Sequence, residues 1–272
     1  MRSASQFLAQ AVARIERLDA RLLLQHVCGL THARLIAAPE TPLTEEQWRG
    51  LEALADRRAA GEPLAYLLGH AEFRGRRFAV SPAVLIPRPE TEELIDLALG
   101  KLAPRVAPRC VDLGTGSGVI AVSLKLECPA AMVSAVDVSA EALDIAVANA
   151  AALGAEVEFR CGSWFLPLAG ERFDLVVSNP PYVAAGDPHL DLNGLPFEPR
   201  GALTDGADGL ACIRAIVAGA PDHLRPGGWL LCEHGFDQAE AVRNLLLTAG
   251  FEAVFSATDL AGKQRFSGGR VH

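Results

Sequence analysis

The chain has 272 residues, half of them hydrophobic, and a formal net charge of −8 at pH 7. This length allows one large domain and a smaller one with real cores, and a charged share of 21% argues against global disorder. The net acidity disfavours a protein that binds DNA or RNA backbones, because such proteins ordinarily carry a basic face.

The first region, residues 1 to about 75, is predicted to be helical. Apolar residues between Phe7 and Leu22 recur at helical spacing, which indicates an amphipathic helix of a folded domain and not a signal peptide. Thr44 and Gln47 have the spacing of a capping box and open a second helical stretch. The region therefore reads as a small helical domain.

The sequence changes character at residues 73–90, and residues 76–90 are predicted to form a connector. A short hairpin is expected around Gly75, and two prolines stiffen the segment that follows it. We expect an ordered connector between a domain at 1–75 and a larger domain at 91–272, and not a flexible linker.

From residue 91 onward, short apolar strands alternate with helical segments. This alternation indicates an α/β fold, with a mostly parallel sheet covered on both faces. The last two strands leave no room for a helix between them, so they are expected to pair antiparallel. The predicted strands are Cys110–Leu113, Met132–Val136, Val157–Arg160, Phe173–Ser178, Trp229–Glu233, Phe251–Ala257 and Gln264–Arg270; the helices are predicted at 92–100, 117–127, 140–153, 207–220 and 237–248.

The six cysteines are scattered, and no two have C-x-x-C spacing, so we expect no metal site. Cys110, Cys161 and Cys232 lie within or beside apolar runs and are predicted to be small buried residues in a reducing compartment. No apolar run reaches the length of a membrane span. We therefore expect a cytoplasmic protein that does not contact membranes.

A glycine-rich turn follows the first strand of the sheet and opens a helix. Glycines let the backbone turn tightly and approach a ligand closely, and ligands bind beyond the carboxyl ends of parallel strands. The dinucleotide fingerprint would need a glycine at Val119, and the Lys-Ser/Thr pair of a P-loop is missing. The pattern instead resembles the turn of class I S-adenosylmethionine-dependent methyltransferases, in the residues Asp112-Leu113-Gly114-Thr115-Gly116-Ser117-Gly118.

Two residues after later strands are expected at the same end of the sheet. Asp137 ends the second strand, where a carboxylate can accept hydrogen bonds from both hydroxyls of a ribose. It could instead cap the next helix, but Ser139 is the better cap, so the ribose role is favoured. Trp164 follows the third strand and either packs beside an adenine ring or serves as a core aromatic.

The most specific signal is the tetrapeptide after the fourth strand, Asn179-Pro180-Pro181-Tyr182. Two prolines directly after a buried strand end its pairing and fix the backbone. An amide nitrogen is a weak nucleophile that must be held in line with a methyl donor. The side-chain oxygen of Asn179 can accept one N–H and the carbonyl of Pro180 the other, in a preformed geometry. The ring of Tyr182 offers a flat face to the planar group.

With these residues identified, the chain resembles the peptide chain release factor glutamine methyltransferases, the PrmC/HemK family. The resemblance runs from the helical start to the C-terminus and includes the segments at 86–92, 178–183 and 259–265. It implies a seven-stranded Rossmann-like class I methyltransferase sheet with a small N-terminal helical domain. It also implies methylation of the side-chain amide nitrogen (N5) of the glutamine in the Gly-Gly-Gln motif of class 1 peptide chain release factors. The methyl donor would be S-adenosylmethionine, and S-adenosylhomocysteine the product.

The resemblance also assigns the site. The catalytic groups would be Asn179 and Pro180. Arg88 and Glu198 either line the pocket or form a linker salt bridge and a loop contact. The cofactor would be contacted by Gly114, Thr115, Gly116, Ser117, Gly118, Asp137, Trp164 and Asn179, and the glutamine would be held by Asn179, Pro180, Pro181 and Tyr182.

Two other functions are compatible with parts of the sequence. An adenine N6-methyltransferase acting on DNA or RNA shares the chemistry of the tetrapeptide, but no basic-aromatic patch or inserted domain is visible to hold an extruded base. A non-catalytic release-factor-binding module would have no need of Asn179. We therefore expect release factors as partners and no direct nucleic acid binding. Because no general base is assigned, no steep loss of rate is expected between about pH 7 and 6.

Overall fold

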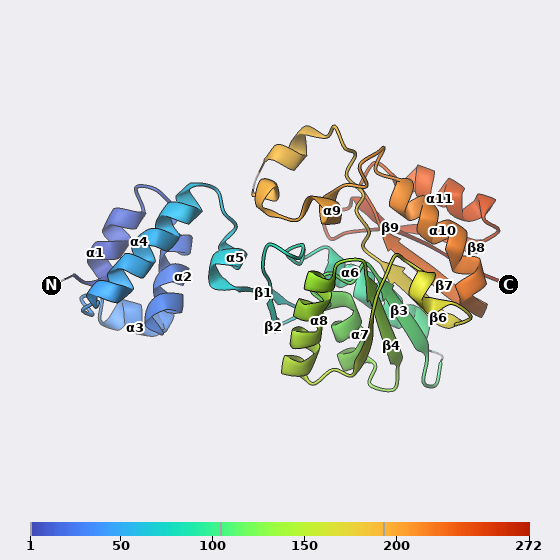
Figure 1. Cartoon of the computed structure of the whole chain (residues 1–272), viewed down its shortest axis with the longest axis horizontal. Helices are drawn as coiled ribbons and strands as arrows, with labels where there is room; N and C mark the ends of the chain where they lie inside the picture. Colours follow the sequence, from blue (N-terminus) through green and yellow to red (C-terminus); the bar gives the residue numbers. More distant parts are fainter. Residues whose placement is uncertain (1, 104, 193) are drawn as a thin grey trace. The chain divides into compact units, whose positions relative to one another are not determined.

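The computed structural model describes residues 2–103, 105–192 and 194–272. The chain forms two compact units, shown in Figure 1. The helical unit comprises Met1–His70 together with Asp191–Phe197, and the sheet unit comprises Ala71–Leu190 together with Glu198–His272. Within the described ranges, no helix combines the length and the apolar character that crossing a membrane requires.

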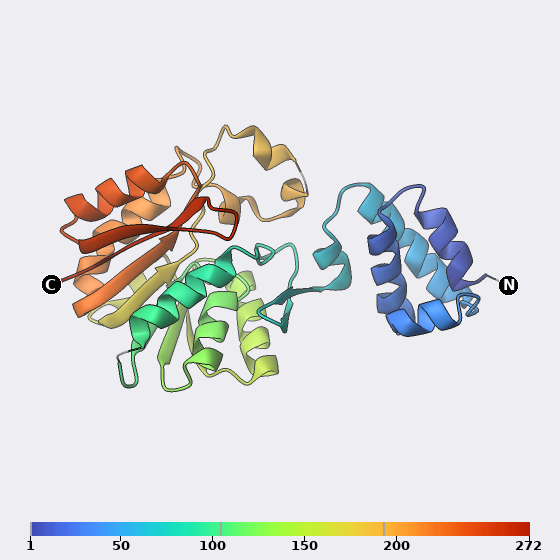
Figure 2. The same cartoon turned by 180° about the vertical axis from the view of Figure 1, so that it is seen from behind.

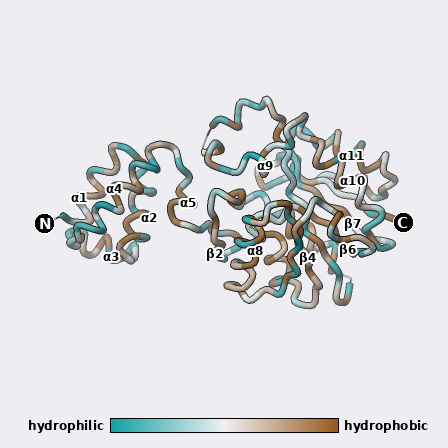
Figure 3. The backbone as a smooth tube through the Cα atoms, viewed as in Figure 1, coloured by the Kyte–Doolittle hydropathy of each residue, from teal (hydrophilic) through white to brown (hydrophobic). Residues whose placement is uncertain are grey.

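The helical unit is built on amphipathic helices, along which apolar and hydrophilic residues are interspersed (Figure 3). Phe7 and Trp48 meet edge to face, with ring centroids 6.0 Å apart, at the centre of its core. The predicted capping box is confirmed, because Thr44 accepts from the backbone of Gln47 and receives its side chain in return. The helices are α1 (Ala4–Ala11), α2 (Arg17–Cys28), α3 (His32–Ala37), α4 (Glu45–Ala59), α5 (Leu64–Leu68) and the short η3 (Leu195–Phe197).

The single helix predicted across Phe7 to Leu22 is wrong. The chain breaks between Val12, which ends α1, and Glu16, which precedes α2. The break lets both helices face one core, and it leaves Leu18 52% exposed although it fits the helical spacing. Neither glycine nor proline marks this turn, so the sequence carries no local signal for it.

The predicted hairpin is present as β1 (His70–Phe73) and β2 (Arg76–Ala79). Its two central residues, Arg74 and Gly75, both have positive φ (49° and 66°), the conformation of a type I′ turn. The guanidinium of Arg74 pairs with Glu127 at 2.6 Å, which fixes the hairpin to the end of helix α7 (Val119–Glu127). The hairpin is therefore attached to the sheet unit by an ion pair.

The sheet unit contains a seven-stranded sheet in the described part of the chain, in the order β5-β4-β3-β6-β7-β9-β8. All seven predicted strands are confirmed. The first five run parallel, and the last pair is antiparallel, as predicted. The strands are β3 (Arg109–Leu113), β4 (Met132–Asp137), β5 (Val157–Cys161), β6 (Phe173–Ser178), β7 (Leu224–Glu233), β8 (Glu252–Thr258) and β9 (Gln264–Arg270).

Helices cover both faces of this sheet, as Figures 1 and 2 show. One face packs against α6, α7 and α8, and the other against α10 and α11, so neighbouring strand residues enter different cores. Cys110 belongs to the first core and Val111 to the second. The covering helices are α6 (Thr91–Leu102), α7 (Val119–Glu127), α8 (Ala140–Leu153), α10 (Ala211–His223) and α11 (Ala239–Thr248); short turns of helix occur at η1 (Leu166–Leu168), η2 (Pro188–Asp191) and α9 (Arg200–Leu203).

The cysteine prediction holds for two of its three residues. Cys110 and Cys232 are buried, and burial raises the pKa of each thiol to about 12. Cys161 is exposed, which corrects the prediction for that residue. It ends β5, the edge strand of the sheet.

Candidate active site

A pocket of 530 Å³ lies beyond the carboxyl ends of β3, β4 and β6 in the sheet unit. This is where the strand order reverses, since β3 is followed by β4 on one side and has β6 on its other side. The pocket brings together the predicted site residues Gly114, Thr115, Gly116, Ser117, Asp137, Trp164, Asn179 and Pro181. Gly118, Pro180 and Tyr182 adjoin these residues in sequence but are not among those that line it.

The glycine turn has the conformation that only glycine adopts freely. Gly114, Gly116 and Gly118 all have positive φ, at 72°, 54° and 84°. A Cβ on Gly118 would also lie 3.1 Å from the Cβ of Ala146, so this glycine allows the turn to pack closely on α8. Gly118 therefore supports the pocket from behind, while the earlier turn residues line it.

Asp137 organises the turn as well as facing the pocket. Its carboxylate accepts from the backbone N–H of Gly116 at 2.8 Å and from that of Ser139 at 2.9 Å. Ser139 caps α8 by accepting from Ala142, as predicted. A carboxylate has about four acceptor positions, so two remain on Asp137 for a ligand.

Trp164 is held in an unusual backbone conformation, with φ at 47°. Positive φ is costly for a bulky side chain and persists where the surroundings enforce it, often at functional sites. The conformation places the indole 3.5 Å from where a Cβ on Gly114 would lie. The ring packs partly against the core and also lines the pocket, so its position is compatible with either predicted role.

The tetrapeptide is anchored by its neighbours on both sides. The strand before it is fully buried, and Pro180 is buried with it. Asn179 donates its side-chain N–H to the hydroxyl of Thr91 at 3.2 Å. Gln238 donates to the carbonyl of Tyr182 at 2.9 Å, which ties the loop to the start of α11.

Two buried residues behind the tetrapeptide, Thr91 and Glu233, were not predicted from the sequence. Glu233, at the end of β7, is 1% exposed and accepts from the hydroxyl of Thr91 at 2.8 Å. The hydroxyl of Tyr182 makes a longer contact of 3.4 Å with its other oxygen. Burial raises the pKa of Glu233 to about 7. The only sequence signal was an acid ending an apolar strand, which does not reveal its distant partners.

Arg88 and Glu198 form a salt bridge of 2.6 Å, which was one of the two alternatives predicted for them. Glu198 is buried and also accepts from the backbone of Ile86 at 3.0 Å. Arg88 also lines the pocket, as the other alternative predicted for this residue. The pair fastens the proline-rich segment to the loop that precedes α9.

Asp112, the acid that opens the glycine turn, is fully buried. One carboxylate oxygen accepts from the hydroxyl of Thr115 at 2.6 Å and from the backbone of Ala121 at 3.3 Å. The other oxygen is buried without a hydrogen-bond partner among the described atoms. Burial is the main cause that raises the pKa of Asp112 to about 7.

Comparison with known families and proteins gives matches along most of the chain. The PrmC N-terminal domain family matches residues 1–69, and the methyltransferase small domain family matches residues 95–193. A release factor glutamine methyltransferase of Bordetella pertussis is 54% identical, over 94% of this chain and 95% of its own length. The protein of the same name from Vibrio cholerae is 44% identical, over 99% and 95%.

Solved structures share the fold at low sequence identity. A methyltransferase from Pyrococcus furiosus superposes with a TM-score of 0.55 at 18% identity, over 79% of this chain and 95% of that chain. The catalytic domain of hMettl16, solved with the MAT2A 3′UTR hairpin 6, gives 0.59 at 14% identity, over 84% and 83%. These likenesses establish a class I methyltransferase fold.

Replacing Asp112 by Asn should change how stability depends on pH. The folded-state pKa is raised from 3.8 to about 7, so the stability that the protonated acid contributes is lost as pH rises toward 7. Between pH 5 and 7, the free energy of unfolding of the wild type should fall by about 2 kcal/mol relative to Asp112→Asn. Urea unfolding of both proteins at each pH measures this. Parallel curves would show that Asp112 is already ionised at pH 5.

Proposed function

The chain belongs to the release factor glutamine methyltransferase family, and from this premise we propose the reaction of its site. The enzyme transfers a methyl group from S-adenosylmethionine to the side-chain amide nitrogen, N5, of the glutamine in the Gly-Gly-Gln motif of class 1 release factors. One observation carries this proposal: Asn179, at the end of β6, lines the same pocket as the glycine turn and Asp137.

The pocket suits the parts of S-adenosylmethionine. The two free acceptor positions on Asp137 would receive the ribose hydroxyls, and the indole of Trp164 would lie against the adenine. Gly114 and Gly116 let the backbone of the turn approach the ligand without a side chain in between. When bound, the cofactor supplies a sulfonium-activated methyl group.

The glutamine amide would be held by two acceptors. The N–H groups of Asn179 face Thr91, which leaves its oxygen to accept one N–H of the substrate. The carbonyl of Pro180 would accept the other. Both hydrogen bonds would strengthen as positive charge develops on the attacked nitrogen, and the proline-stiffened loop would hold both acceptors ready beforehand. No base is required before the methyl group is transferred.

The substrate class is tested by following tritium from labelled cofactor into the organism's release factors, into DNA, or into neither. The proposal predicts label in the release factor alone. Label in DNA would indicate the adenine methyltransferase, and cofactor binding without transfer would indicate a binding module. The net charge of −8 favours the protein substrate over the nucleic acid.

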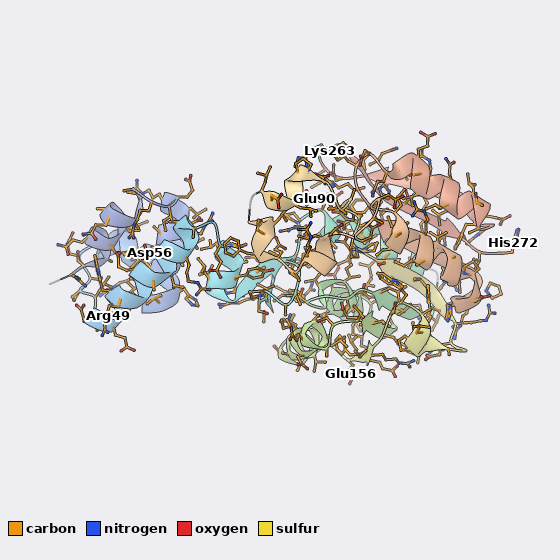
Figure 4. The ribbon with its side chains drawn as sticks, turned by 45° about the horizontal axis from the view of Figure 1, so that its top comes forward. Arg49, Asp56, Glu90, Glu156, Lys263 and His272 are labelled. Atoms are coloured by element: carbon orange, nitrogen blue, oxygen red, sulfur yellow. The ribbon has the colours of Figure 1, made fainter. Side chains whose placement is uncertain are left out.

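The helical unit would serve recognition of the intact release factor. A glutamine side chain offers too few atoms to select one residue among all proteins, so a second contact is needed. The unit carries an open groove with an apolar lining that includes Val12 and Ile36, 45% and 68% exposed, and with Arg17 and Arg21 beside them. Arg14 also lines the groove, but its guanidinium is paired with Asp56 at 2.6 Å (Asp56 is labelled in Figure 4).

Asp137→Ala should weaken binding of S-adenosylmethionine by about 1.5–3 kcal/mol, the range for hydrogen bonds to a charged group. The variant loses the acceptors for the ribose and the bond that orders Gly116. Isothermal titration calorimetry measures the affinity, and circular dichroism checks that the variant is folded. An unchanged affinity in folded protein would leave Asp137 with a structural role only.

Asn179→Ala should lower turnover on the release factor roughly 100-fold or more, as for loss of one preorganised transition-state partner. Cofactor affinity should fall much less, because most of the cofactor contacts are made elsewhere in the pocket. Steady-state kinetics at saturating substrates gives the rate, and calorimetry gives the affinity. Near-normal turnover would remove Asn179 from the mechanism.

Ile36→Asp should lower kcat/KM on intact release factor about tenfold, the effect of losing one apolar contact in an interface. Its activity on a short peptide that contains Gly-Gly-Gln should not change, since such a peptide lacks the folded surface that the groove is proposed to bind. Leu18→Asp is the matched control, because Leu18 is 52% exposed in the same unit but lies outside the groove lining. Equal effects of both variants, or none, would contradict a recognition role for this groove.

A further inference from the structure

Behind the tetrapeptide, a chain of hydrogen bonds links three side chains from different elements. The amide of Asn179, after β6, lies 3.2 Å from the hydroxyl oxygen of Thr91, the first residue of α6. That hydroxyl lies 2.8 Å from a carboxylate oxygen of Glu233, at the end of β7. Thr91 and Glu233 are 2% and 1% exposed, so water does not readily replace either partner.

The direction of this chain follows from counting hydrogens. A hydroxyl has one hydrogen, and an ionised carboxylate can only accept. Thr91 must therefore give its hydrogen to Glu233 and can only accept from Asn179. A carboxamide has donors at one end and an acceptor at the other, so the nitrogen of Asn179 must face Thr91. Its oxygen then lies on the side of the carboxamide away from Thr91, and both residues line the pocket.

We propose that Thr91 and Glu233 are positioning residues that fix which end of the Asn179 carboxamide faces the substrate. This inference rests on the proposed function, in which Asn179 must present an acceptor to the glutamine N–H. Thr91 touches Asn179 directly, whereas Glu233 acts through Thr91. The hydroxyl of Tyr182 contacts the second oxygen of Glu233 at 3.4 Å, so the same carboxylate steadies both ends of the tetrapeptide.

Protonation of Glu233 would undo the constraint. A carboxylic acid can donate to Thr91, whose own hydrogen is then free to turn toward Asn179 and select its oxygen instead. The turned carboxamide would present N–H groups to the substrate N–H, which repel it. Glu233 has a pKa raised to about 7 by burial, so the constraint should hold above pH 7 and weaken as pH falls below it.

Several charged groups face Glu233 from the elements around it. Arg265, before the middle of β9, favours the ionised form, and Glu90, before α6, disfavours it. The adjacent His234 is fully buried against Ser267 at 2.8 Å, and burial lowers its pKa, so it stays neutral in this range. Of these groups, Glu90 is labelled in Figure 4.

The proposal departs from the expectation of a flat rate between pH 7 and 6. The single-turnover rate of methyl transfer should fall as pH drops below about 7, by up to tenfold per pH unit for one titrating group. Glu233→Gln, which cannot ionise, should lose this dependence. The measurement uses saturating cofactor and intact release factor.

Thr91→Val removes the hydroxyl and keeps the branched shape of the side chain. Its rate at pH 8 should fall roughly tenfold or more, since a misdirected Asn179 loses a transition-state contact. Thr91→Ser restores the hydroxyl and should recover the rate to within about threefold of wild type. Ser123→Ala is the matched control, because Ser123 is a fully buried hydroxyl on α7 that has no hydrogen-bond partner among the described atoms.

A readout that needs no substrate separates this inference from the proposed function. In protein labelled with 15N-asparagine, the side-chain NH2 signals of Asn179 are assigned by their loss in Asn179→Ala. In the wild type these signals should shift as pH passes through about 7, and in Thr91→Val they should not. The inference would be overturned if the Asn179 signals of the wild type did not shift with pH. It would also be overturned if Thr91→Val transferred the methyl group as fast as Ser123→Ala. The expected NMR shifts with no methylation of release factor would overturn the proposed function alone.

Discussion

The structure depends on one constraint of the sheet: the chain leaves β3 and β6 toward opposite faces. α7 follows β3 and packs in one core, whereas α10 follows β6 and packs in the other. The carboxyl ends of these neighbouring strands therefore have no covering helix between them, and a crevice opens there. The glycine turn follows β3 and the tetrapeptide follows β6, so residues 65 positions apart at Leu113 and Ser178 are paired in register directly beneath the site.

The chemistry of the crevice depends on a second constraint, namely which of its groups donate hydrogen bonds and which accept them. The site must present acceptors to a planar nitrogen, and carbonyls, carboxamides and carboxylates are among the acceptors that proteins supply. A carboxylate next to the nitrogen would instead attract the positively charged sulfonium. The fold instead places the carboxylate of Glu233 one step back, behind Thr91, and leaves a neutral amide at the front. Charge is thereby used for orientation and kept away from the reacting atoms.

The sequence predicted those features that depend on local pattern. The alternation of strands and helices predicted the sheet, and two prolines marked the end of β6. The glycines predicted the tight turn, in which Gly114, Gly116 and Gly118 have positive φ. The sequence could not predict contacts between residues that are far apart in the chain. The partners of Glu233 lie 142 and 51 positions away, at Thr91 and Tyr182. The turn between α1 and α2 was missed because tertiary packing, and no breaker residue, ends the first helix.

The most direct test of the account is where the methyl group goes. Release factor incubated with the enzyme and S-adenosylmethionine is digested and sequenced by tandem mass spectrometry. The account predicts one added methyl group, on the side-chain amide of the glutamine in Gly-Gly-Gln, and none on a factor in which that glutamine is replaced by glutamate. Methylation at another residue, or an unmodified motif after complete cofactor turnover, would contradict it.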